Sequence, residues 1–220
     1  MKFKMMGAAI RRGAIGRGVI VAALLVPLAA CGGLLRRSGV EQIYVLHPAE
    51  PAAAGAVTPT PGVLSVRRPE VQPGLETMRI ALLRPGNRLD YFADSRWGAS
   101  LPQVVDAFAT QTLLSSNRFE SVSDSERGGG AERFVLSLMV RHFEAAYSAN
   151  EAAPPQVHVA FECLLLTGGA REPLGRCDGQ ATVPAAENRM ESIVQAFEAA
   201  ARQAMEQVVT KVAGLAANTR

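Results

Sequence analysis

Two long runs in which apolar and polar residues alternate constrain the fold most strongly, because successive side chains of a β-strand point to opposite faces. The runs cover residues 133–147 and 157–167, and a shorter run at 174–183 follows a Gly-Gly turn. In the first run, one face would carry Phe134, Leu136, Leu138 and Val140, and the other Val135, Ser137, Met139, Arg141 and Phe143. In the second, the apolar face would carry Val157, Val159, Phe161, Cys163 and Leu165. Both patterns predict long strands that bury one face of a sheet.

Helices and shorter strands complete the predicted fold. Ser100 and Gln103 have the spacing of a capping box, which indicates that a helix begins there. The clearest helix covers about residues 187–215, where apolar side chains recur three and four residues apart. This stripe predicts a core face, and the alternative is a groove-binding or oligomer-forming face. Strands are expected at 43–46, 63–68 and 119–122, and a hairpin pairs 78–83 with 89–92 through a turn at 85–87. The predicted fold class is α+β, a mostly antiparallel sheet with two helices packed on one face.

The first thirty residues have the pattern of an export signal. Residues 1–18 carry five Lys or Arg residues and no acidic residue. The apolar segment at 19–30 is too short for a transmembrane helix, which needs roughly 20 apolar residues. These features are typical of a signal peptide that is removed after export. The sequence therefore predicts a signal peptide at 1–30, a tether at 31–42 and a single domain at 43–220.

The end of this segment, Leu28-Ala29-Ala30-Cys31, resembles the lipobox of bacterial lipoproteins. In those proteins the peptide is cut before the cysteine, whose sulfur carries diacylglycerol and whose amine is acylated, commonly with palmitate. The resemblance implies that Cys31 is a lipid attachment site, and several acyl chains give stable anchoring. The alternative is a plain signal peptide with a chance cysteine at the cut. Gly32, where some lipoproteins have aspartate, resembles the pattern for export to the outer membrane.

Removal of the signal peptide changes the charge of the protein. Five of the 23 Lys and Arg residues, and none of the 20 Asp and Glu residues, lie in residues 1–30. The mature chain would carry 18 basic and 20 acidic side chains, a net charge of about −2. The sequence pI of about 9.0 therefore belongs mostly to the signal peptide, and the mature domain lacks the basic surface of a nucleic-acid-binding protein.

The two remaining cysteines have matched positions. Cys163 and Cys177 fall in the two arms of one predicted hairpin, equally far from its centre near Ala170. A symmetric hairpin would place them directly opposite each other, with Cα atoms about 4.5 Å apart in a non-hydrogen-bonded pair. Because export leads to a compartment that permits disulfides, we predict a cross-strand disulfide, and two buried free thiols are the alternative.

No motif in the sequence points to catalysis. The Gly-x-Ser-x-Gly nucleophile elbow does not occur, and the glycine run at 128–130 lacks the lysine of a phosphate-binding loop. The three histidines, His47, His142 and His158, do not cluster, so each is interpreted as a surface or hydrogen-bonded residue. The sequence therefore predicts a protein that is not an enzyme, with no catalytic, cofactor-binding or metal-binding residues.

An ordered set of short motifs resembles one known family. The motifs are Cys31, Tyr44-Val45-Leu46, Gly62-Val63-Leu64-Ser65-Val66, Asn87-Arg88-Leu89-Asp90-Tyr91-Phe92, Trp97 and the helix start Leu101-Pro102. Together they resemble the ABC-type transport auxiliary lipoproteins, the PqiC/YmbA-like family, over nearly the whole mature chain. The sequence departs from that family at Ile43, where a second aromatic residue is typical, and in a Pro- and Ala-rich extension after His47.

The resemblance implies a non-catalytic partner of an intermembrane lipid-transport system. Such systems combine a permease and an ATPase in the inner membrane with MCE-domain proteins that bridge the periplasm. The lipoprotein would sit on the periplasmic face of the outer membrane and dock the transporter, alone or as an oligomer. Trp97, Asn87 and Tyr91 are the expected partner contacts, unless Trp97 packs against the first helix. The alternative function is a lipoprotein that itself binds a lipid, which requires that the Leu164 and Leu166 side of the sheet stay unfilled.

Overall fold

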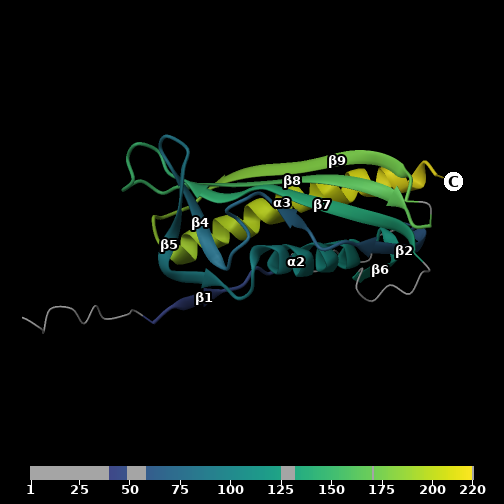
Figure 1. The fold of residues 1–220 in the computed structure, drawn as a ribbon, viewed down its shortest axis with the longest axis horizontal. Coiled ribbons are helices and arrows are strands. Elements are labelled where there is room, and N and C mark those ends of the chain that lie inside the picture. The colour runs from purple at the N-terminus through teal and green to yellow at the C-terminus, as the bar shows by residue number, and fades with distance from the viewer. Residues whose placement is uncertain (1–39, 49–57, 125–131, 170, 220) are drawn as a thin grey trace, which may run out of the picture. The chain divides into compact units, whose positions relative to one another are not determined.

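The computed structural model describes residues 40–48, 58–124, 132–169 and 171–219. Val40–Arg220 form one compact unit, and the predicted signal peptide and Cys31 lie outside the described residues. The described residues form nine strands and two helices (Figure 1). The strands are β1 (Gln42–Tyr44), β2 (Thr60–Val66), β3 (Glu70–Val71), β4 (Arg79–Arg84), β5 (Arg88–Trp97), β6 (Phe119–Asp124), β7 (Glu132–Ala146), β8 (Gln156–Thr167) and β9 (Pro173–Pro184). The helices are α2 (Leu101–Ser115) and α3 (Met190–Ala217).

The nine strands form one mixed sheet around the long strand β7. On one side β7 pairs antiparallel with β8, which pairs antiparallel with β9. On its other side β7 pairs in parallel with β2, then β3, then β4. Parallel pairs also join β1 to β5 and β2 to β6. The predicted α+β class is confirmed, but the expectation of a mostly antiparallel sheet is only partly right, because side-chain alternation does not encode strand direction.

A β-bulge in β7 corrects the predicted face of Phe143. The register between β7 and β8 shifts between Val140 and His142, so that an extra residue enters β7. Phe134 to Val140 keep the predicted alternation, whereas Phe143 turns to the core side and is buried. The prediction that Phe143 shares a face with Met139 is therefore wrong, because one inserted residue reverses the facing of every later side chain.

The helix α3 runs along β8 and β9 and covers one face of these strands (Figure 1). Its buried face confirms the predicted core stripe and is wider than predicted, because alanines fill positions between the large residues. The buried residues are Ile193, Val194, Ala196, Phe197, Ala200, Ala201, Ala204, Met205, Val208, Val209, Val212 and Ala216. The other helix, α2, begins after Ser100 as predicted and contacts β6 and α3. Among the described residues, no helix is long and apolar enough to cross a membrane.

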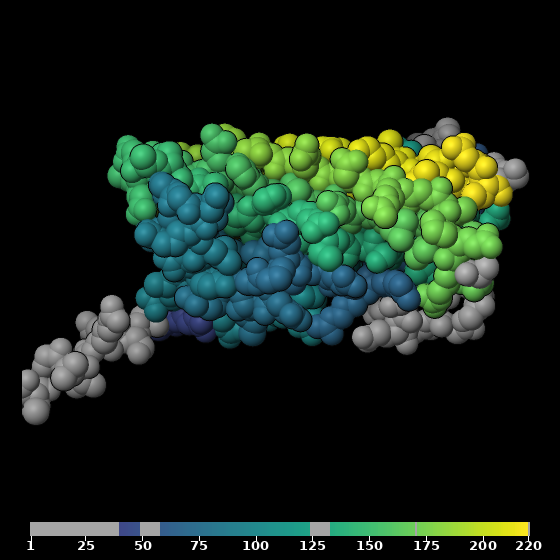
Figure 2. Space-filling model, turned by 45° about the horizontal axis from the view of Figure 1, so that its top comes forward, coloured from purple at the N-terminus to yellow at the C-terminus, as the bar shows by residue number. Residues whose placement is uncertain are grey.

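Two side chains of α3 cover part of the open edge of β9. The Gln207 side-chain amide accepts a hydrogen bond from the Gln180 N–H at 3.3 Å and donates one to the Gln180 carbonyl at 2.9 Å. The Lys211 ammonium donates to the Asp178 carbonyl at 2.9 Å. An exposed edge strand is a template for unwanted strand pairing, and these contacts occupy part of it. Figure 2 shows the surface formed by the green strands β8 and β9, with β4 and β5 in blue at one end.

Candidate interaction site

The β4–β5 hairpin lies beside the loop that joins β7 to β8 (Figure 1). Arg84 pairs with Arg88 across the hairpin, so its turn contains residues 85–87, as the sequence predicts. Gly86 and Asn87 both have positive φ angles, of 82° and 58°, which glycine and asparagine adopt more readily than other residues. The Tyr147 N–H donates to the Leu83 carbonyl at 2.8 Å and joins the hairpin to the end of β7. We call the turn at 85–87 and the loop at 148–155 the hairpin end.

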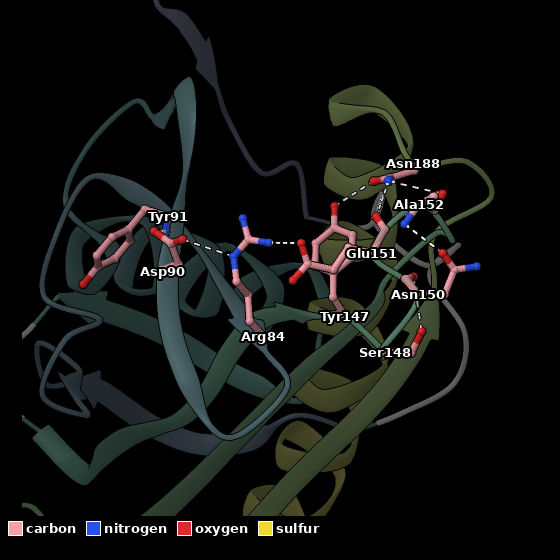
Figure 3. Close-up of polar contacts among 9 residues, drawn as sticks. All are labelled: Arg84, Asp90, Tyr91, Tyr147, Ser148, Asn150, Glu151, Ala152 and Asn188. Atoms are coloured by element: carbon pink, nitrogen blue, oxygen red, sulfur yellow. Dashed lines mark hydrogen bonds and ion pairs between the residues drawn. The ribbon is translucent and has the colours of Figure 1, made fainter.

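Arg84 links the two parts of the hairpin end (Figure 3). Its Nε donates to Asp90 Oδ2 at 3.1 Å within the hairpin, and its Nη1 pairs with the Glu151 carboxylate in the opposite loop. These contacts raise the pKa of Arg84, the Glu151 hydrogen bond most. The pKa of Asp90 is lowered, first by the Tyr91 N–H and then by Arg84. Arg84 therefore stays charged and holds two acidic side chains from two separate segments.

Asn188, two residues before α3, fixes the same loop (Figure 3). The Tyr147 hydroxyl donates to Asn188 Oδ1 at 2.7 Å, and Asn188 Nδ2 donates to the Glu151 carbonyl at 3.0 Å. Burial is the main cause that raises the pKa of Tyr147, so its hydroxyl remains a donor at neutral pH. The loop is thus held by a hairpin, a strand end and a helix start. A surface held in one conformation loses less conformational entropy on binding.

The structure separates the three residues expected to contact a partner. Asn87 is exposed at the tip of the hairpin. Tyr91 is half-buried; its hydroxyl donates to the Gly74 carbonyl at 2.7 Å, and the Arg79 guanidinium carbon lies 4.1 Å from its ring centroid. Tyr91 therefore supports the hairpin as well as facing solvent. Trp97 ends the same strand but does not reach the surface.

The expectation that Trp97 contacts a partner is wrong. Only 1% of this residue is exposed, and its ring packs edge-on against Phe197 at 5.3 Å and Phe143 at 6.0 Å between centroids. Phe143 and Phe197 stack at 5.1 Å. Trp97 packs against Phe143 of β7 and Phe197 of α3 in this cluster, and it belongs to the same buried core as Leu101 of α2. The bulge in β7 explains why this cluster could not be predicted, since Phe143 reaches it only through the reversed facing.

No motif in the sequence marks Arg84, Glu151 or Asn188 as residues of this site. Arg84 and Glu151 are 67 residues apart, and Asn188 is 37 residues from Glu151. No short-range pattern relates them, because their contacts depend on the pairing of β4 with β7. The turn residues at 85–87 provided the one local signal for this part of the molecule.

The predicted pairing of Cys163 with Cys177 has a direct counterpart in the structure. The two residues are opposite each other in the register of β8 and β9, and a disulfide joins them, with Cα atoms 4.9 Å apart. Both are buried. Cys31, the predicted lipid attachment site, lies outside the described residues.

An open groove of about 440 Å³ lies over β7, β8 and β9 on the side of Leu164. Four charged residues line it, namely Glu70, Glu162, Arg176 and Asp178. Glu162 also accepts a hydrogen bond from Arg141 at 2.7 Å, which lowers the pKa of Glu162, while Leu166 is buried. Binding an acyl chain in this groove would cost free energy, because it would remove water from these charged side chains. Within the described ranges, no group of three His, Cys, Asp or Glu residues could hold a metal ion.

Comparison with known proteins identifies a family and two similar structures. Residues 44–209 match the model of a family described as ABC-type transport auxiliary lipoprotein component. No curated protein matches the sequence. A solved structure of a DUF330 protein from Xanthomonas campestris is similar, with a TM-score of 0.70 at 17% identity over 81% of this chain and 99% of that chain. Another, of an uncharacterized protein, has a TM-score of 0.56 at 13% identity over 81% and 97%. At these identities, the likeness to the solved structures shows a shared fold.

Proposed function

Because this chain belongs to the family of ABC-type transport auxiliary lipoproteins, we propose that it is a lipid-anchored docking component of an MCE-type intermembrane lipid transporter. The family match over residues 44–209 carries this proposal, and the predicted export signal at 1–30, followed directly by Cys31, supports it. In this proposal Cys31 carries the acyl chains and the domain works on the periplasmic face of the outer membrane. The family is an auxiliary component and not an enzyme family, so we assign no catalytic residue.

The hairpin end is the surface that we assign to the transporter. Asn87 presents an exposed polar side chain on a turn, and the Arg84 and Asn188 contacts hold that turn against the loop at 148–155. The charges of Arg84, Asp90 and Glu151 are largely satisfied by one another. Such a surface favours hydrogen bonding to a partner over a purely electrostatic attraction, because its charges are already paired.

Replacing Cys31 tests the anchor. The Cys31→Ser chain should move from the membrane fraction to the soluble periplasmic fraction, whereas Cys163→Ser should stay with membranes as a matched control. Labelled palmitate should be incorporated into the wild type and the control only. A Cys31→Ser chain that still sediments with membranes in high salt would show that another contact anchors the protein.

Site-specific photo-crosslinking tests the docking surface. A photoreactive residue at Asn87 should give a crosslink to an MCE-domain protein in intact cells. The same residue at Gln203, an exposed position in the middle of α3, serves as control and should give none. Crosslinks from Gln203 but not from Asn87 would overturn the choice of surface. A lipid retained by the purified mature domain in native mass spectrometry would instead favour a lipid-carrying protein.

A further inference from the structure

The first strand, β1, turns apolar side chains outward at an edge of the sheet. Ile43 is 57% exposed and Val45 is 52% exposed, and Val40, just before the strand, is 90% exposed. Tyr44 and Leu46, which alternate with them, pack against the core. Edge strands usually expose polar or charged residues, so exposed aliphatic side chains at this edge indicate a surface that binds a partner. We call Val40, Ile43 and Val45 the β1 patch.

The β1 patch lies on a rigid support. β1 pairs with β5 only, and it is the last strand on that side of the sheet among the described residues. The Gly98 N–H donates to the Tyr44 carbonyl at 2.8 Å. A β-carbon built on Gly98 would lie 3.4 Å from Val45 Cγ1 and 3.7 Å from Ile43 Cγ2, so the patch borders the side-chain-free backbone of Gly98. The aliphatic surface is therefore continuous from Ile43 to Val45.

A contact with α3 holds the far end of the same segment. The His47 N–H donates to Glu198 Oε1 at 2.9 Å, and His47 Nδ1 lies 3.0 Å from the same oxygen. Arg202 Nη2 lies 3.8 Å from the other oxygen of Glu198. Residues 42–47 are thus joined to the sheet through β5 and to α3 through His47.

The length and the charge of the chain before β1 favour a membrane as the partner of the β1 patch. Residues 32–39 separate Cys31 from Val40, and nine peptide steps span at most about 32 Å when fully extended. These residues include Arg36 and Arg37 and no acidic residue. Cationic side chains next to an anchor are attracted to anionic lipid headgroups. A lipid anchor on Cys31 would therefore keep the β1 patch within about 32 Å of the leaflet that holds it.

We propose that the β1 patch enters the interface of the leaflet that holds the anchor on Cys31, and thereby orients the domain on the membrane. The inference rests on the proposed lipid attachment, because the tether length matters only if Cys31 is anchored. One noncovalent contact beside a lipid anchor gives the domain a second attachment point. With two attachment points the domain keeps one face toward the membrane, so the hairpin end is presented to the transporter in a constant direction.

A fluorescent label on the patch tests this in the lipidated full chain. Ile43→Cys, labelled with an environment-sensitive dye, is reconstituted into vesicles of phosphatidylethanolamine and phosphatidylglycerol that contain brominated acyl chains. Leu114→Cys in α2 is the matched control, an aliphatic residue with 50% exposure. Cys163 and Cys177 are joined in a disulfide, so they do not react with the dye. The label at 43 should be quenched at least about fivefold more than the label at 114. Equal quenching of the two labels would overturn the proposal. Dye emission typical of an apolar environment at position 43, without quenching by the brominated lipid, would also overturn it and would indicate a protein partner.

A second measurement separates the β1 patch from the anchor. Flotation of the full chain with vesicles reports on Cys31, whereas partition of the unanchored Cys31→Ser chain into the same vesicles reports on the patch. Adding Ile43→Ser and Val45→Ser should weaken this partition about tenfold, since each replaced side chain is about half exposed and available to the lipid. Thermal unfolding should be unchanged, because both side chains lie outside the core. An unchanged partition would refute the patch even if flotation confirms the anchor.

Discussion

The close approach of α3 to the sheet at Gly179 of β9 allows a direct test of their packing. A β-carbon placed on Gly179 would lie 2.0 Å from the Ala204 carbonyl oxygen and 2.9 Å from Val208 Cγ2. The first of these atoms belongs to the helix backbone and cannot move away by a change of rotamer. Gly179→Ala therefore requires α3 to move away from β9 along part of its buried face.

The expected cost follows from this geometry. Overpacking a core typically destabilises a protein by about 1–3 kcal/mol, and a backbone clash lies at the upper end of that range. We expect Gly179→Ala to lose about 3 kcal/mol of unfolding free energy, a large part of the roughly 5–15 kcal/mol of a typical domain. Urea unfolding followed by circular dichroism measures this loss as a lower midpoint at an unchanged slope.

Gly214→Ala is the matched control within α3. Apart from the neighbouring backbone of α3 itself, no atom lies within 4 Å of a β-carbon built on Gly214, and glycine in a helix costs about 1 kcal/mol relative to alanine. This variant should therefore be stabilised by up to about 1 kcal/mol. If the unfolding free energy of Gly179→Ala stays within about 0.5 kcal/mol of the wild-type value, α3 does not pack on β9 at the distance given above, and the predicted clash is refuted.

Three further predictions concern the core, the disulfide and the hairpin end. Phe143→Ala should cost about 3–5 kcal/mol in urea unfolding because it empties the centre of the aromatic cluster, and a loss below about 1 kcal/mol would contradict the bulge. Replacing Cys163 and Cys177 by serine should cost about 3 kcal/mol, the entropy of a loop of this size, and thiol counting on the denatured mature chain should find two thiols only after reduction. Because the pKa of Asp90 is lowered in the folded protein, Asp90 stabilises the fold above its unfolded pKa, and this stabilisation is lost as the pH falls through its folded pKa. Arg84→Ala should raise the folded pKa of Asp90, which an NMR titration of its carboxyl group measures. An unchanged Asp90 titration would exclude the ion pair.

Several features of this protein follow from the sequence alone because they depend on neighbours within one element. Alternation identifies β7 and β8, and a three- and four-residue spacing identifies α3. The turn at 85–87 and the capping pattern at Ser100 mark the ends of elements, because the conformational preferences of Pro, Gly, Asn and Ser act locally. The opposition of Cys163 and Cys177 also follows, since symmetry about a short loop determines the register of a hairpin.

Only the tertiary structure decides the features that join distant segments. Parallel pairing of β7 with β2, β3 and β4 depends on which strands meet across long connections, and strand direction leaves no trace in side-chain alternation. The bulge in β7 reverses the facing of Phe143, which with Phe197 packs against Trp97, a residue for which the sequence leaves both partner contact and packing open. Arg84 and Glu151 meet for the same reason, because the sheet brings together residues that local preferences cannot relate.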